Sequence, residues 1–174
     1  MEENKSCCSC KSGCCSDKKS TKDIVIDFLY LDLTICERCK GTDNNLDEAI
    51  NDVSGVLKAA GYKVKINKIN ITSKEEAIKY KFISSPTIRI NGNDIAVDVK
   101  ESICESCGDL CGENVDCRVW NYEGIDYNEP PKEMIVNAIL KEIYAVDKSA
   151  NKVGADYILP HNLEVFFEGK LNNK

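Results

Sequence analysis

The pattern of apolar side chains changes abruptly near residue 23, where an almost fully apolar run begins. The segment IVIDFLYLDL, residues 24–33, is β-branched, aromatic or otherwise apolar at nearly every position. Such a run predicts a central strand that is covered on both faces of its sheet. Residues 1–22 contain almost no apolar side chain besides cysteine and are rich in Lys and Ser. They bury too little surface to offset the entropy of ordering, so we expect a disordered arm.

Apolar residues at helical spacing occupy the segment after this strand. They are Leu46, Ala49, Ile50, Val53, Val56, Leu57 and Ala60. The spacing predicts a helix of about five turns, with Thr42 or Asp43 as its N-cap and Gly61 as its terminator. Residues 40–42 would then separate Cys39 from the helix start. That separation would weaken the effect of the helix dipole on the thiol pKa.

A second strand and a short second helix are predicted next. Apolar residues alternate from Tyr62, and the alternation changes phase before Ile69. This pattern predicts a strand with a bulge or bend. The short helix that follows has two candidate capping boxes, Ser73 with Glu76 or Thr72 with Glu75.

A hairpin and two helices complete the predicted elements. A strand begins at Pro86, the Asn91-Gly92 pair predicts a tight turn, and a returning strand extends to residue 99. Pro130 and Pro131 open a last core helix with one apolar face. The tail is expected to form a short amphipathic helix that docks on the domain through Leu163, Phe166, Phe167 and Leu171. The predicted order is therefore β-α-β-α-β-β-α.

Composition excludes several classes of function. The chain has 174 residues and a formal net charge of −6, and its aromatic residues are not interleaved with basic ones, which disfavours nucleic-acid binding. No membrane span is evident, because Asp27 and Asp32 interrupt the longest apolar stretch, and no secretory signal is evident, because residues 1–22 hold no apolar segment. We therefore expect a cytoplasmic protein without a membrane partner. The single histidine, His161, disfavours a Ser/His/Asp relay or a multi-histidine metal site.

Cysteine is the residue type that carries candidate chemistry. The chain contains 11 cysteines, and in a reducing compartment such residues are more often catalytic or metal-binding than structural disulfides. Cys36 and Cys39 form a C-x-x-C pair at a predicted strand-to-helix turn, where two thiols can close a small disulfide ring. Arg38 or Lys40 would favour the attacking thiolate. We expect Cys36, as the more exposed thiol, to attack and Cys39 to resolve; the alternative is a pair of inert buried thiols.

The C-x-x-C pair and the segment Ser85-Pro86-Thr87, in this order of elements, resemble the thioredoxin fold. The resemblance implies a cis bond before Pro86, in a loop that faces the dithiol. More closely, TICERCKGT, SSPTIRING and ESICESCGDLCGENVDCRVW together resemble a thioredoxin-like family known only as domain-of-unknown-function family 2703, over about residues 24–144. The chain differs from ordinary thioredoxins because no Trp precedes Cys36 and Glu-Arg stands between the two cysteines.

A second group of cysteines follows the hairpin, in a polar, glycine-containing segment. Its members are Cys104, Cys107, Cys111 and Cys117, spaced C-x2-C-x3-C-x5-C. Four thiolates at this density are candidate ligands for one tetrahedral zinc ion, although two separated C-x2-C knuckles are the usual pattern. The spacing does not match the bacterial ferredoxin run, so an iron-sulfur cluster is not favoured. The alternative is a set of free thiols or local disulfides.

Topology places the two groups of cysteines at one end of the domain. In the thioredoxin arrangement the first strand ends at the dithiol, and the fourth strand returns toward it. The segment after Val99 should therefore emerge beside Cys36 and Cys39, and all six cysteines should lie close together. The aromatic residues Trp120, Tyr122 and Tyr127 are expected either to cover this end or to pack a loop without regular structure.

The arm carries five further cysteines in nine positions: Cys7, Cys8, Cys10, Cys14 and Cys15. Soft thiolates at such density select zinc, copper(I) or a trivalent metalloid over hard cations. The alternative is a compositionally biased tail with exposed thiols and no assigned role.

These observations predict an α/β protein with a thioredoxin-like β-α-β-α-β-β-α sandwich and a Cys-rich insertion before the last core helix. The predicted units are the arm (1–22), the domain (23–145, with the insertion at 100–129) and a C-terminal extension (146–174). Three functions stay open: thiol-disulfide exchange with a partner protein through Cys36, Cys39 and Pro86; binding or transfer of a soft metal or metalloid such as zinc; and a zinc-stabilised interaction domain.

Overall fold

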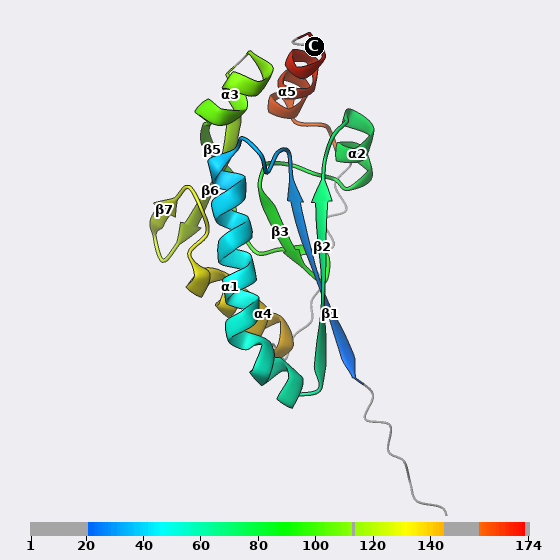
Figure 1. The fold of residues 1–174 in the computed structure, drawn as a ribbon, viewed down its shortest axis with the longest axis vertical. Coiled ribbons are helices and arrows are strands. Elements are labelled where there is room, and N and C mark those ends of the chain that lie inside the picture. The colour runs from blue at the N-terminus through cyan, green and yellow to red at the C-terminus, as the bar shows by residue number, and fades with distance from the viewer. Residues whose placement is uncertain (1–20, 113, 145–156, 173–174) are drawn as a thin grey trace, which may run out of the picture.

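The computed structural model describes residues 21–112, 114–144 and 157–172, which form a mixed α/β fold. The core elements are β1 (Lys22–Tyr30), α1 (Glu37–Ala59), β2 (Tyr62–Asn70), α2 (Lys74–Lys79), β3 (Thr87–Ile90), β4 (Asn93–Asp94) and α4 (Lys132–Tyr144). Between β4 and α4 lie β5 (Lys100–Ile103), α3 (Glu105–Cys111), β6 (Asp116–Tyr122) and β7 (Ile125–Tyr127), and α5 (His161–Asn172) is the last described helix (Figure 1).

The main sheet has the strand order β2-β1-β3-β4. Strand β1 pairs in parallel with β2 and antiparallel with β3, and β3 pairs antiparallel with β4. The prediction that residues 24–33 contain a central strand is therefore confirmed. The order and directions of the strands are consistent with the thioredoxin-like arrangement, and the Ser85–Pro86 bond is cis, as the resemblance implies.

One face of this sheet carries most of the core. Ile24, Ile26 and Phe28 of β1 are buried in a cluster with apolar residues of α1 and α4. The opposite face is different, because Val25 and Asp27 are only half-buried. The expectation that β1 is covered along both faces is thus wrong for its first half. On that face the Asp27 carboxylate accepts a hydrogen bond from the neighbouring strand β2 instead of packing beneath another layer.

Strand β2 is continuous, so the predicted bulge is absent from it. Its register with β1 runs without interruption from Lys22 opposite Tyr62 to Tyr30 opposite Asn70. The change of apolar phase has another cause. Tyr62 packs against the cluster beneath α1, whereas Ile69 packs against a second cluster at the other face, beside α2 and α5. An edge strand whose two ends pack against different hydrophobic clusters, on opposite faces of the sheet, produces the same change of phase in the sequence as a bulge.

The predicted turns are present, but the returning strand is shorter than expected. Ser73 is the N-cap of α2, and its hydroxyl accepts a hydrogen bond from the Glu76 backbone N–H. Asn91 and Gly92 both have positive φ, as the tight turn requires. Strand β4 then ends at Asp94, because the Asp94 carboxylate accepts the Ala96 N–H and turns the chain out of the sheet.

The insertion has regular structure, which corrects the expectation of an irregular loop. Strands β5, β6 and β7 form a separate antiparallel sheet, and α3 lies between the first two. Strand β6 buries Arg118 and Trp120 on one face and Cys117 on the other. Glu123 and Gly124 supply the two positive-φ residues of the β6–β7 turn. This Glu-Gly turn was not among the predicted turns.

The C-terminal extension contains the predicted amphipathic helix. Leu163, Phe166 and Phe167 of α5 are buried, whereas Leu171 is exposed. The helix lies beside α3 at the end of the domain where α1 begins (Figure 1). Within the described ranges, the structure has no helix with the length and apolar character needed to cross a membrane.

A buried ion pair joins the insertion to the main sheet. The Arg118 side chain is fully buried, and its Nη1 donates to Asp94 Oδ1 at 2.9 Å. The guanidinium also stacks over the Trp120 ring, 5.1 Å from its centroid. Arg118 Nε and Nη2 have no hydrogen-bond partner among the described residues. The Asp94 carboxylate therefore carries most of the compensation for this buried charge.

Removal of the Asp94 carboxylate should destabilise the fold strongly. Asp94→Ala leaves the Arg118 charge buried without its partner, and we expect a loss of about 3 kcal/mol in the free energy of unfolding. The control is Asp126→Ala, which breaks an exposed pair with Lys100. It should cost at most about 1 kcal/mol. Urea denaturation measures both variants, and equal losses would contradict the role given to the buried pair.

Candidate metal centre

The turn between β1 and α1 is built by a carboxylate. Asp32 Oδ1 accepts hydrogen bonds from the backbone N–H of Thr34 at 2.6 Å, the Thr34 hydroxyl at 2.6 Å and the Ile35 N–H at 2.9 Å. An Asp side chain that bonds the backbone two residues later is a typical turn former. This turn delivers the chain to Cys36 at the end of the sheet. The Asp-x-Thr sequence is a signal that the sequence analysis left unused.

Helix α1 begins earlier than the sequence analysis predicted. Cys36 is the N-cap, and its Sγ accepts a hydrogen bond from the Cys39 N–H at 3.4 Å. The predicted caps, Thr42 and Asp43, lie inside the helix. The Thr42 hydroxyl donates to the Arg38 carbonyl instead of capping. The expected separation between Cys39 and the helix start is therefore absent, and both thiols lie in the first turn, near the positive end of the helix dipole.

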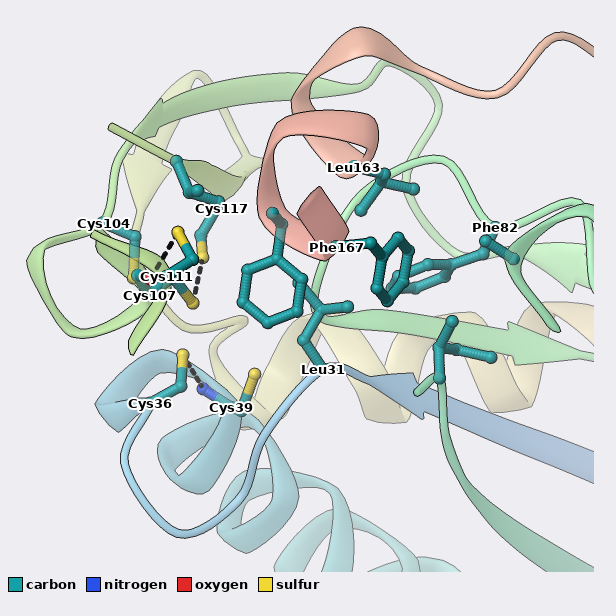
Figure 2. Close-up of a cluster of buried hydrophobic side chains, with 14 of the residues drawn as sticks. Leu31, Cys36, Cys39, Phe82, Cys104, Cys107, Cys111, Cys117, Leu163 and Phe167 are labelled. Carbon is teal, nitrogen blue, oxygen red and sulfur yellow. Dashed lines mark hydrogen bonds between the residues drawn. The ribbon is translucent and has the colours of Figure 1, made fainter. Parts of the chain in front are cut away.

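The thiols of the insertion meet Cys36 at this helix start. The Sγ atoms of Cys36, Cys104, Cys107 and Cys117 all lie within 4.8 Å of one another, and all four residues are buried. The Cys107 and Cys117 sulfurs are 3.3 Å apart. Figure 2 shows Cys36 rising from α1 toward the cysteines that face it from the insertion. We call these four residues the thiol cluster. The prediction that the two groups of cysteines lie close together is confirmed.

Two cysteines of the predicted site lie outside the thiol cluster. The Cys111 Sγ donates to the Cys107 carbonyl at 3.2 Å, inside α3. The Cys39 Sγ lies 3.4 Å from the Ser85 hydroxyl, in the loop that carries Pro86. The set of converging thiols therefore contains Cys36 in the place that the spacing gave to Cys111. The spacing of the insertion cysteines could not reveal that Cys36 takes the place of Cys111, because Cys36 is 68 positions before Cys104.

The Arg38 side chain attaches the insertion to α1. Its Nη1 donates to the carbonyls of Ser102 at 3.4 Å and Cys117 at 3.2 Å, and its Nη2 donates to the Ile103 carbonyl at 2.9 Å. The predicted second cation, Lys40, forms a surface ion pair with Glu37 at 2.7 Å. Arg38 therefore aligns the strands that carry the cluster, and charge-assisted bonds of this kind are stronger than neutral ones.

The insertion also covers the loop around Pro86. The Arg118 N–H of β6 donates to the Ser85 carbonyl at 2.7 Å, so the two segments are joined by a backbone hydrogen bond. Cys36 and Cys39 are only 1% and 0% exposed beneath this cover. Cys36 is therefore not appreciably more exposed than Cys39, and its expected role as the attacking thiol stays a prediction. The physical reason is the insertion, which contributes both a backbone partner for the loop and three thiols for Cys36.

Neighbouring thiols determine the protonation of the cluster. Hydrogen bonding, first from Cys104 and then from Cys107 and Cys117, lowers the pKa of Cys36 well below its ordinary value, although burial opposes this. The pKa of Cys104 is lowered to about 7, mainly by hydrogen bonding with the Cys107 side chain. The pKa values of Cys107 and Cys117 are raised, first by their interaction with Cys104. Interaction with Cys36 raises the pKa of Cys39. The arrangement thus favours thiolates on Cys36 and Cys104.

Helix α5 packs against the outer side of α3. An ideal Cβ added at Gly169 would lie 2.4 Å from the Cys111 carbonyl oxygen and 2.9 Å from its Cβ. Only glycine allows the two helices to approach so closely. Phe167 and Leu163 complete the apolar surroundings of the cysteines (Figure 2). The Asn162 side chain fixes the start of α5 by accepting the Asp116 N–H at 2.9 Å and donating to the Asp116 carbonyl at 2.6 Å.

The cysteine-rich arm cannot be placed in this site. Cys7, Cys8, Cys10, Cys14 and Cys15 lie outside the described residues. The predictions of disorder and of soft-metal binding for residues 1–22 therefore stay predictions, apart from residues 21 and 22, of which Lys22 begins β1.

Comparison with known families agrees with the sequence resemblance. The family model described as "Domain of unknown function (DUF2703)" matches residues 24–139, which includes the whole thiol cluster. The chain belongs to this family. No curated protein and no solved structure matches the chain.

Substitution of Gly169 should separate α5 from α3. In Gly169→Ala the new methyl group overlaps the Cys111 carbonyl, and overpacking of this kind typically costs about 1–3 kcal/mol. The matched control is Gly55→Ala in α1, where an added Cβ meets nothing within 4 Å. That change should stabilise the helix by about 0.5–1 kcal/mol. Thermal melts should therefore shift in opposite directions, and a shared direction would contradict the close approach at Gly169.

Proposed function

We propose that this protein binds a soft metal ion, with the thiolates of Cys36, Cys104, Cys107 and Cys117 as its four ligands. The observation that carries the proposal is the convergence of four buried sulfurs within 4.8 Å of one another. A tetrahedral zinc site with Zn–S bonds of about 2.3 Å places its sulfurs about 3.8 Å apart. The cluster therefore needs only small side-chain adjustments to surround one ion. Tetrahedral sites of four sulfurs are typical of zinc or iron, and zinc is the reference ion for the tests.

The surroundings of the cluster support a metal more than a set of free thiols. Burial in an apolar cluster disfavours isolated thiolates, whereas a divalent cation among them compensates their charge. The first turn of α1 also directs a backbone N–H at Cys36 Sγ. Thiol ligands must lose their protons to bind, and Cys36 and Cys104 are the two that favour the thiolate.

The ligands come from two parts of the chain. Cys36 belongs to the core, whereas Cys104, Cys107 and Cys117 belong to the insertion. A bound ion would therefore crosslink the insertion to the start of α1, next to the contacts that Arg38 makes. The same ion would serve an interaction domain stabilised by zinc, so the proposal covers both a structural metal and a transferable one. How fast the ion exchanges with a chelator distinguishes these two uses.

Thiol-disulfide exchange through Cys36 and Cys39 is a second candidate function. It is favoured by the position of Cys36 as the N-cap of α1, with Cys39 one turn later and the Pro86 loop beside it. The burial of both thiols beneath the insertion disfavours reaction with a large protein partner. A partner protein would first have to displace β6 from the Ser85 carbonyl.

Loss of Cys36 should remove a tight metal site from the full chain. We expect Cys36→Ser to weaken zinc affinity by at least about 100-fold, because even loss of a residue that only supports a ligand costs 10- to 100-fold. Cys111→Ser is the matched control, since its hydroxyl can keep the hydrogen bond to the Cys107 carbonyl. Competition with a chromophoric chelator under anaerobic conditions measures both. The wild-type chain and both variants carry the same five arm cysteines, so zinc bound by the arm does not account for a difference between them. Equal affinities for the two variants would contradict the assigned ligand set.

Zinc binding should release more protons as the pH falls. The pKa of Cys104 is about 7, so at higher pH this ligand is already a thiolate, whereas at lower pH the metal must displace its proton. The apparent affinity should therefore decrease with falling pH, and more steeply below about pH 7. Calorimetry at pH 6 and pH 8, in buffers of different ionisation enthalpy, counts the protons. A count that does not increase at pH 6 would contradict this role of Cys104.

A further inference from the structure

We infer that the metal site is under redox control, because a Cys36–Cys39 disulfide and a metal ion bound by Cys36 exclude one another. This inference rests on the proposed function and adds a regulation to the same site. Cys36 is the one thiol that belongs to both groups, the C-x-x-C pair and the thiol cluster. A sulfur that is bonded in a disulfide carries no charge and has lost its capacity as a thiolate ligand. The two states therefore compete for a single atom.

The geometry of the first turn of α1 suits a disulfide. Helix residues three positions apart have Cβ atoms about 5–6 Å apart, whereas a disulfide places them about 3.5–4.5 Å apart. Cys36 is the N-cap, so its backbone is extended rather than helical and is not bound to that helical separation. Cys36 and Cys39 already interact, since the Cys39 N–H donates to Cys36 Sγ at 3.4 Å. Bond formation between them needs side-chain rotation and a local adjustment of the first turn at the N-cap.

Cys39 is placed as the partner that the metal does not use. Its sulfur lies beside the Ser85 hydroxyl, which in turn accepts the Leu31 N–H at 3.2 Å. These contacts hold Cys39 next to Cys36 but apart from the thiols of the insertion. The proposed ligand Cys36 thus has a neighbouring thiol, Cys39, that is not a ligand. A disulfide between the two can therefore compete with metal binding at Cys36.

The consequence for the metal follows from the origin of its ligands. Among the proposed ligands, only Cys36 comes from the core, and the three others come from the insertion. Oxidation at Cys36 leaves three thiols without the fourth ligand and removes the crosslink between α1 and the insertion. The Arg38 contacts with the carbonyls of Ser102, Ile103 and Cys117 would still hold the insertion in place. Metal release therefore need not unfold the domain.

The reaction requires a small disulfide as oxidant. The Cys36 thiolate attacks one sulfur of that disulfide, a mixed disulfide forms, and the first small thiolate leaves. Cys39 then loses its proton to this thiolate and attacks Cys36 Sγ, so that the Cys36–Cys39 bond forms and the second small thiolate leaves. The protein has lost two electrons, which have reduced the small disulfide to two thiols. The metal ion leaves, and the remaining cluster thiolates take up protons from solvent.

A cavity beside α3 borders the thiol cluster at Cys104, which is itself buried. The cavity has a volume of about 540 Å³, and Cys104 belongs to its lining. Since Cys104 Sγ lies within 4.8 Å of Cys36 Sγ, a molecule in this cavity approaches the shared ligand. The oxidised forms of dithiothreitol and glutathione are small disulfides of the class that the reaction requires.

A redox titration of the full chain at several zinc concentrations tests this competition. Differential alkylation and peptide mapping follow the Cys36–Cys39 disulfide in defined thiol/disulfide buffers. Because one zinc ion is lost for each two-electron oxidation, every tenfold increase in free zinc above the dissociation constant should shift the midpoint by about 30 mV to more oxidising potentials. A midpoint that is independent of zinc would overturn the inference, because disulfide and metal would then coexist.

Variants and a prior binding measurement complete the design. Cys39→Ser should retain zinc at potentials where the wild-type chain has lost it, whereas Cys111→Ser should release zinc as the wild type does. Mapping that finds a Cys107–Cys117 disulfide as the oxidised product would also overturn the inference, since those sulfurs are 3.3 Å apart. Zinc binding is measured before any oxidant is added. If the protein does not bind zinc, the proposed function is contradicted. If it binds zinc but the wild type and Cys39→Ser lose zinc at the same potentials, only the redox control is contradicted.

Discussion

The convergence of Cys36 with three thiols of the insertion is the constraint on which this end of the molecule depends. Four sulfur atoms within 4.8 Å of one another are a costly arrangement for an apolar interior unless protons or a metal ion neutralise them. The surrounding structure is arranged to hold them there. Asp32 forms the turn before α1, Arg38 binds the carbonyls of β5 and β6, and α5 packs closely against α3 at Gly169.

This convergence also explains why the insertion is folded rather than irregular. A loop would not hold three thiols in register with a fourth on α1. The β5–β6 ladder does so, because it sets Ser102 opposite Cys117 and β5 ends directly before Cys104. The buried Arg118–Asp94 pair then ties β6 to the main sheet. The insertion thus forms a second, smaller sheet. Its position relative to the core is fixed by the Arg38 hydrogen bonds to its carbonyls, by the buried Arg118–Asp94 pair and by the thiol cluster.

Much of the fold could be predicted from local patterns, because each element is determined by neighbours in sequence. The apolar run of β1, the Asn91-Gly92 turn and the helix after Pro131 are of this kind. The start of α1 was predicted too late because Thr42 and Asp43 are good caps, whereas cysteine is not a usual one. The membership of the thiol cluster was beyond prediction by spacing alone, since tertiary contacts bring Cys36 to it in place of Cys111. The Glu123-Gly124 turn was readable but missed.

The central claim is that Cys36 and the three insertion thiols bind one ion together. X-ray absorption at the zinc edge, on the full chain loaded anaerobically with one equivalent of zinc, tests it most directly. The account predicts four sulfur neighbours at about 2.3 Å, and a change to three sulfurs and one lighter atom in Cys36→Ser. A zinc environment with fewer sulfurs, or one that is identical in Cys36→Ser, would contradict it.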